Sequence, residues 1–261
     1  VDLDSDGYND LLLSDYAKSE WANWAGSYQA DGGSALFFYQ GTEIDGGDQV
    51  ISYDSATDSL FYLTIDEDYA YLGQSLTSGD TNGDGVHDTI AISTPGSSEY
   101  ASRAGCVHLV NSTEYDAIND YIAPLGGVGY ELVLEEGRIW LDAGQLGEFD
   151  IANPVSICSS TENSRTGWNA GTQFGDFDGD GNTDIAIGLP GSNGVAVFYS
   201  VNTLSGSLLL EDADTFIQSS GGPSAFGFGM NVGDFNGDGI DDLAIAAPDL
   251  VEPANAANAN F

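Results

Sequence analysis

The chain has 261 residues, of which 42 are acidic and only four are lysine or arginine, so its formal net charge at pH 7 is −38. Such an acidic surface repels nucleic acid and anionic membranes, and we therefore expect no nucleic acid partner. An apolar run of about 18 residues is absent, which predicts no membrane span in this segment, and the hydrophobic content of 41% is sufficient for a folded core.

One acidic loop occurs four times along the chain, at residues 2–10 (DLDSDGYND), 80–88 (DTNGDGVHD), 176–184 (DFDGDGNTD) and 234–242 (DFNGDGIDD). Each copy has carboxylate or amide oxygens at positions 1, 3, 5 and 9, and a glycine at position 6 that permits a sharp turn. Ca2+ prefers hard oxygen ligands at this spacing, with the backbone carbonyl of position 7 as a further ligand. The sequence therefore predicts four Ca2+ sites. Their ligand residues are Asp2, Asp4, Asp6, Tyr8 and Asp10; Asp80, Asn82, Asp84, Val86 and Asp88; Asp176, Asp178, Asp180, Asn182 and Asp184; and Asp234, Asn236, Asp238, Ile240 and Asp242.

The segments that follow the loops distinguish two kinds of calcium protein. An EF-hand needs a bidentate glutamate at position 12 and a helix on each side, whereas position 12 is apolar in all four copies. Short β-rich runs follow instead, at 11–13, 89–92, 185–187 and 243–245, and each ends near a turn of Pro, Gly or Ser. Together with 35 glycines, these runs predict an all-β fold.

The residues around the loops also repeat. Leu72-Gly73 and Phe226-Gly227 stand eight residues before their loops, Trp168-Asn169 takes the same place before the third loop, and turns containing Pro95, Pro190 and Pro248 follow. This pattern resembles the FG-GAP repeat of integrin α-subunit β-propellers. Copies two and four match closely, copy three has asparagine in place of glycine, and copy one lacks its first strand. The resemblance implies a ring of about seven blades when intact and a face that recognises partners without catalysis.

The spacing of the loops predicts two complete and two incomplete four-stranded blades of a partial β-propeller. Residues 1–66 form a partial first blade, with strands at 10–13, 35–39 and 60–65. The aromatic segment 18–33 between them, with Trp21, Trp24 and Tyr28, is predicted to be a loop that either contacts a partner or covers a small satellite core.

The remaining blades follow in order. Blade two (67–166) has strands at 72–78, 89–93 and 106–110, a fourth at 131–134 or 139–141, and an insertion with a helical turn at 113–118. Blade three (167–218) includes a strand at 195–199. Blade four (219–250) is partial, with strands at 226–232 and 243–246, and a low-complexity tail follows at 251–261. Because the chain opens inside a repeat, we expect it to be an internal portion of a longer secreted protein.

Two cysteines, Cys106 and Cys158, lie between the second and third loops. An extracellular location favours a disulfide between them, and two buried free thiols are the alternative. Asn111-Ser112-Thr113 is a glycosylation sequon whose use the sequence leaves open.

No hydrolase, metalloprotease or nucleotide-binding motif is present in the sequence. His87 is expected to be a solvated loop residue and His108 a sheet residue, with no partner nucleophile for either. We therefore predict a non-enzymatic, extracellular calcium-binding propeller used in adhesion, recognition or surface and filament assembly. Its partners would be a protein or glycan on the cell surface or neighbouring copies. The alternative is an accessory or lectin-like propeller domain of a secreted carbohydrate- or lipid-active enzyme.

Overall fold

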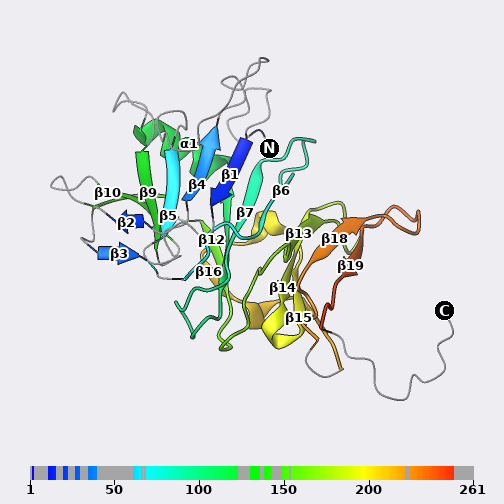
Figure 1. The fold of residues 1–261 in the computed structure, drawn as a ribbon. Helices are drawn as coiled ribbons and strands as arrows, with labels where there is room; N and C mark the ends of the chain where they lie inside the picture. Colours follow the sequence, from blue (N-terminus) through cyan, green and yellow to red (C-terminus); the bar gives the residue numbers. More distant parts are fainter. Residues whose placement is uncertain are drawn as a thin grey trace, which may run out of the picture.

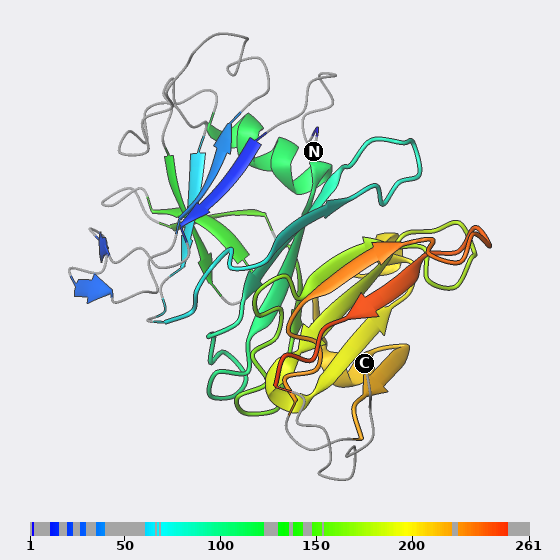
Figure 2. The ribbon, with the colours of Figure 1, turned by 45° about the vertical axis from the view of Figure 1, so that its right-hand side comes forward.

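The computed structural model describes residues 2, 11–15, 20–22, 27–29, 35–39, 61–65, 67, 69–122, 130–135, 138–142, 148–152, 154–220 and 224–249. Strands are the main secondary structure of these residues, and they form several sheets that lie side by side (Figures 1 and 2). The fold is a partial β-propeller, and the described residues do not close a ring. None of the described helices has both the length and the apolar character that crossing a bilayer requires.

Blade three shows the repeated unit in its complete form. Four strands pair antiparallel in chain order, and the two central strands are buried along their whole length. The strands are β13 (Thr172–Gly175), β14 (Asp184–Leu189), β15 (Gly194–Phe198) and β17 (Thr215–Gln218).

Blade two has the same antiparallel order, extended by a short parallel strand at its outer edge. Its strands are β6 (Leu76–Gly79), β7 (Thr89–Thr94), β8 (Cys106–Asn111) and β12 (Val155–Cys158), with β16 (Ser207–Leu209) added beside β12. The fourth strand is therefore β12, and the prediction that 131–134 or 139–141 would fill this place is wrong.

Those two segments belong to the sheet of blade one. There β1 (Leu11–Asp15), β4 (Ala35–Tyr39) and β5 (Phe61–Ile65) pair antiparallel, and β5 pairs parallel with β9 (Tyr130–Glu135). β10 (Arg138–Asp142) and β11 (Glu148–Ala152) complete the sheet. Leu132 and Leu134 stand opposite Leu63 and Ile65, and all four side chains are buried. Burial of these apolar side chains in one core explains why the insertion returns to blade one.

Blade four contributes β18 (Met230–Gly233) and β19 (Asp242–Ile245), which pair antiparallel. A separate hairpin joins β2 (Glu20–Ala22) to β3 (Ser27–Gln29) and places Trp21 opposite Tyr28, so these two aromatics lie in strands and not in a loop as predicted. Trp24 lies outside the described residues.

The predicted helical turn is a full helix, α1 (Ser112–Ile122). Asn111 begins it with a capping box, since its Oδ1 accepts the N–H of Glu114 at 3.2 Å while Glu114 Oε2 accepts the N–H of Asn111 at 2.9 Å. The buried side chains of Tyr115 and Ile118 join α1 to the core between blades one and two. Short 3-10 turns, η4 (Pro190–Ser192), η5 (Val201–Thr203) and η6 (Leu210–Asp212), connect the strands of blade three.

Apolar residues on alternate sides of the central strands build a separate core at each junction between blades. Ile90 and Ile92 of β7 face the core shared with blade one, whereas Ala91 between them faces blade three. In β14, Ile185 and Ile187 face blade two and Ala186 faces blade four. Because successive strand side chains point to opposite faces, a continuous apolar run is what a strand enclosed on both sides requires.

In blades two, three and four, a glycine before the first strand allows neighbouring blades to approach closely. Gly73, Gly167 and Gly227 all have positive φ, and each donates its N–H to a carbonyl at the end of the second strand of its own blade. A Cβ on Gly73 would lie 2.6 Å from Ser14 Cβ of blade one, and a Cβ on Gly167 would lie 2.7 Å from Ser93 Cβ of blade two. In blade three, the glycine position before the first strand is therefore occupied by Gly167. The prediction that Asn169 would occupy it is wrong.

Candidate metal loops

The second, third and fourth acidic loops occupy equivalent places in their blades. Each connects the first strand to the second: 80–88 joins β6 to β7, 176–184 joins β13 to β14, and 234–242 joins β18 to β19. Figure 2 shows these connections, in teal, yellow-green and orange, projecting from the same side of the row of sheets. Of the first loop only Asp2 is described; Asp4, Asp6, Tyr8 and Asp10 lie outside the described residues.

The carboxylate at position 1 holds each loop in a closed turn. In the third loop, Asp176 Oδ1 accepts the N–H of Gly179 at 2.8 Å and Oδ2 accepts the N–H of Gly181 at 3.0 Å. Asp80 accepts the N–H groups of the glycines at positions 4 and 6 of the second loop, both at 2.7 Å. Asp234 does the same in the fourth loop, at 2.6 Å for position 4 and 2.9 Å for position 6. The three loops therefore share one backbone conformation.

Glycine is needed at two positions of this turn. Gly179 and Gly181 have φ of +77° and +87°, and the corresponding glycines of the other two loops have φ between +80° and +90°. A side chain at such φ is strained. The requirement was predicted only at position 6; the glycine at position 4 in these three loops was the sequence signal for the second.

Oxygens at positions 3 and 5 complete the turn. Asp178 Oδ1 accepts the N–H of Asp180 at 3.1 Å, and Asp180 Oδ1 accepts the N–H of Asn182 at 2.7 Å. The equivalent bonds occur in the second loop (2.9 and 2.9 Å) and the fourth (2.8 and 2.9 Å). Each of these side chains thereby accepts the N–H of the residue two positions farther along its loop.

The aspartate at position 9 ties the end of each loop to its beginning. Asp184 Oδ2 accepts the N–H of Phe177 at 2.8 Å, and its Oδ1 accepts the N–H of Ser200 at 2.9 Å. Asp88 accepts the N–H of Thr81 at 2.7 Å, and Asp242 accepts the N–H of Phe235 at 3.0 Å. The position 9 carboxylate is thus held beside the position 1 end of the loop.

Negative charge is concentrated in the third loop. Carboxylate oxygens of Asp176, Asp178 and Asp180 all lie within 4.8 Å of one another. Burial raises the pKa of Asp184, and the charges of Asp178 and Asp176 raise it further. Hydrogen bonds from Asn182 lower the pKa of Asp180, which keeps it ionised. This arrangement of hard, mutually repelling oxygens fits a divalent cation.

In the fourth loop, the N–H groups of Gly239 and Gly237 lower the pKa of Asp234. The residues at position 7 of the three loops, Val86, Asn182 and Ile240, are all exposed. Asp234, Asn236 and Asp238 have the same hydrogen bonds as their counterparts in the third loop, with an amide oxygen replacing one carboxylate. The second and fourth loops thus offer an equivalent oxygen set with one fewer charge at position 3.

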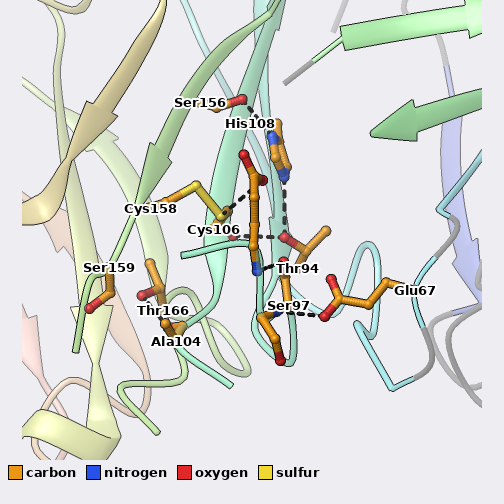
Figure 3. Close-up of a disulfide and its surroundings, with 12 residues drawn as sticks. Glu67, Thr94, Ser97, Ala104, Cys106, His108, Ser156, Cys158, Ser159 and Thr166 are labelled. Carbon is orange, nitrogen blue, oxygen red and sulfur yellow. Dashed lines mark hydrogen bonds between the residues drawn. A yellow bond between two sulfur atoms is a disulfide. The ribbon is translucent and has the colours of Figure 1, made fainter. Parts of the chain in front are cut away.

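A disulfide lies away from the loops, within blade two. Cys106 of β8 and Cys158 of β12 stand opposite each other and are bonded, as the sequence analysis favoured (Figure 3). The bridge spans 52 residues and encloses α1 and strands β9 to β11, so it fixes both ends of the insertion within blade two.

Both histidines lie within hydrogen-bond distance of a serine hydroxyl. His108 is buried, with Nδ1 at 2.8 Å from Ser156 Oγ and Nε2 at 3.2 Å from Thr94 Oγ1 (Figure 3), and burial lowers its pKa to about 4. It is a neutral sheet residue at physiological pH. His87 is exposed at position 8 of the second loop and lies 2.9 Å from Ser78 Oγ.

Two family comparisons match the repeats seen in the fold. The FG-GAP-like repeat matches residues 176–245, and the FG-GAP repeat matches residues 72–110. These matches contain the second, third and fourth loops, and the strand that follows each of them.

Three known proteins share sequence with the chain. Integrin alpha-E of Mus musculus is 34% identical over 163 residues, covering 58% of this chain and 14% of that protein. Phosphatidylinositol-glycan-specific phospholipase D of Dictyostelium discoideum is 32% identical over 134 residues (50% and 12%), and integrin alpha-PS2 of Drosophila melanogaster is 30% identical over 119 residues (43% and 8%). The chain thus spans a small part of the length of each relative.

Proposed function

Because this chain is an FG-GAP repeat protein related to integrin α-subunits, we propose that it is an extracellular calcium-binding propeller that acts in adhesion, recognition or assembly at a surface. Its Ca2+ ions would be structural, one in each acidic loop. The relatives named integrins support an outward-facing, partner-binding role, and the disulfide is consistent with an oxidising compartment.

The observation that carries the proposal is the common geometry of three loops from three blades. In each, positions 1, 3, 5 and 9 place oxygens around one turn whose backbone the same glycines permit. Position 7 would add its backbone carbonyl. The first loop would bind a fourth ion through Asp2, Asp4, Asp6, Tyr8 and Asp10 by the same sequence pattern.

Calcium would stabilise the propeller by neutralising the crowded carboxylates. A loop that repels itself when empty becomes a cross-link when an ion sits between positions 1 and 9, so binding free energy adds to the free energy of unfolding. Ca2+ accepts six to eight oxygens in flexible geometry, whereas Mg2+ requires a near-ideal octahedron and retains water. We therefore propose Ca2+ as the ion.

A second candidate function follows from the phospholipase D of Dictyostelium discoideum. Its similarity to half of this chain favours a propeller attached to a secreted lipid-active enzyme, with the chemistry performed by another domain. In that case this chain would position the enzyme and would itself be non-catalytic.

The test is a titration of the calcium-free chain with CaCl2 by isothermal calorimetry. Four loops predict about four ions per chain, with dissociation constants on the order of 10⁻⁴ to 10⁻³ M if the sites resemble those of other extracellular modules. Asp180→Ala should remove one ion, and the exposed helix substitution Asp116→Ala should remove none. Absence of binding at millimolar Ca2+ would overturn the proposal. Adhesion of cells or glycans to the immobilised chain then distinguishes recognition from a purely accessory role.

A further inference from the structure

Position 8 of each described loop touches position 1 of the loop that precedes it along the chain. Thr183 of the third loop donates its hydroxyl to the backbone carbonyl of Asp80 in the second loop. Asp241 of the fourth loop contacts Asp176 of the third. His87 of the second loop accepts at its carbonyl the N–H of Asp2, 3.2 Å away, in the first. The contact thus recurs at three successive junctions, although the atoms that make it differ.

Two hydrogen bonds and an apolar contact join the third and fourth loops. The N–H of Asp241 donates to the carbonyl of Asp176 at 2.9 Å, and the carboxylate of Asp241 accepts the N–H of Asp176 at 3.0 Å. Ile240 packs over the third loop as well, because a Cβ added to Gly179 would lie 2.9 Å from its Cδ1. The side chains of Asp241 and Ile240 therefore both contact the third loop, whereas His87, which occupies position 8 of the second loop, was expected to be solvated.

The contact joins position 1 of one loop to position 8 of the next, and a bound ion would order both positions. Position 1 holds the preceding loop closed, because its carboxylate accepts the N–H groups of positions 4 and 6. Position 8 lies between the two candidate ligands at positions 7 and 9 of its own loop. An ion that orders positions 7 and 9 therefore also orders position 8, and through it the backbone of position 1 in the preceding loop.

We propose that position 8 couples neighbouring loops, so that Ca2+ in one loop raises the affinity of the next. This coupling rests on the proposed calcium binding. An empty loop must be ordered when its ion binds, and a neighbour that already holds position 1 or position 8 reduces that entropic cost. Direct repulsion between ions in adjacent loops acts in the opposite direction, and physiological salt screens it over about 8 Å.

Site-resolved Ca2+ titration by NMR in about 0.15 M salt tests the coupling. The amide resonances of Gly85, Gly181 and Gly239 report on their loops separately, since each N–H is bonded to the position 1 carboxylate. Asp180→Ala removes a ligand from the third loop only. We expect the Ca2+ midpoints of the second and fourth loops to rise about fivefold in this variant. Asp178→Ala, which removes the position 3 ligand of the same loop, should give the same result if the Asp180→Ala variant folds poorly.

Thr183→Val then removes only the hydroxyl that links the third loop to the second. In this background, Asp180→Ala should no longer shift the midpoint of Gly85 but should still shift that of Gly239, because the contacts of Asp241 remain. Thr203→Val is the matched control, since the exposed Thr203 donates its hydroxyl locally to Ser200; it should leave the coupling intact.

The outcomes separate this inference from the proposed function. If no glycine resonance responds to Ca2+, the calcium proposal itself fails. If all three respond and Asp180→Ala leaves the midpoints of Gly85 and Gly239 unchanged, the loops bind Ca2+ independently and the coupling is overturned. Persistence of the full Gly85 shift in the Thr183→Val background would show that position 8 does not link the sites.

Discussion

Asp176 and Asp241 form a reciprocal contact between two blades: the N–H of Asp241 donates to the carbonyl of Asp176 at 2.9 Å, and the carboxylate of Asp241 accepts the N–H of Asp176 at 3.0 Å. Asp241 is an acidic residue that the repeat pattern does not count as a ligand. Its contacts show that part of the chain's acidity serves the junctions between blades.

Replacement of Asp241 by alanine should therefore destabilise the junction between blades three and four. The N–H of Asp176 would lose its acceptor, and the expected decrease in the free energy of unfolding is about 1–2 kcal/mol. Urea unfolding in saturating Ca2+ measures this decrease. Asp116→Ala, exposed on α1, should change stability by less than about 0.5 kcal/mol; equal effects of the two substitutions would contradict the assigned role.

Removal of Ca2+ should lower the melting temperature of the chain. The loops would lose the cation that offsets their crowded carboxylates, and linkage makes this loss depend on ion concentration. Differential scanning calorimetry in EGTA should show the decrease, with full recovery on adding Ca2+ and smaller recovery with Mg2+. A melting curve unaffected by EGTA would mean that the loops hold no stabilising ion.

Gly181→Ala tests the left-handed turn at position 6. A Cβ there would meet nothing within 4 Å, so the cost comes from the backbone φ of +87° alone. We expect a loss of about 1–2 kcal/mol in stability and weaker Ca2+ binding in the third loop. Gly181→Asn should lose less, because asparagine tolerates this region better.

Gly229→Ala provides the matched control for that substitution. Gly229 does not have positive φ, and its nearest neighbour to an added Cβ is Asn169 Nδ2 at 3.8 Å, an ordinary contact distance. Its substitution should leave calcium affinity unchanged. Similar loss of affinity in both variants would show that the left-handed turn is not what limits binding.

Acidification should destabilise the fold through His108. Burial lowers its folded pKa to about 4, below the value of 6.5 expected when unfolded, so the unfolded state binds the extra proton first. The stabilisation from the neutral ring is complete above pH 6.5 and is lost as the pH falls toward 4. The total is on the order of 3 kcal/mol.

The measurement is unfolding free energy against pH for the wild type and His108→Gln, both in saturating Ca2+. Titration of the loop carboxylates affects both proteins alike, so the difference between the curves isolates the histidine. A difference that stays constant from pH 7 to about 4 would rule out the depressed pKa.

Loss of the disulfide should destabilise blade two. Cys106→Ala with Cys158→Ala frees a segment of 52 residues, and the expected loss is about 2–4 kcal/mol. Since both cysteines are buried, dithiothreitol should reduce the native protein slowly and the urea-unfolded protein quickly. Rapid reduction under native conditions would contradict the buried position.

The local pattern allowed the loops and their flanking strands to be predicted well. A glycine between alternating oxygens favours one turn whatever surrounds it, and the apolar runs after the loops indicated the buried strands β7 and β14. The helix α1 was predicted as a single turn, although Asn111 and Glu114 contained the capping signal for a longer one.

Long-range pairing was predicted less well. β9 and β12 have similar apolar character, and only the structure shows that β9 pairs with β5 while β12 completes blade two. Likewise, the spacing of the third repeat placed Asn169 at the position of the repeat's glycine, and the structure places Gly167 there, two residues earlier.

By itself the sequence determined the repeat, the oxygen-bearing residues of its loops and the β-rich blades, because each depends on residues within one short segment. The tertiary structure alone decided which strand is the outermost of each blade and which residue of one loop contacts the neighbouring loop. Those choices depend on burying apolar side chains and pairing backbone groups that are dozens of residues apart. Strands of similar composition can fill the same place in a sheet, so only the packing of the whole chain selects between them.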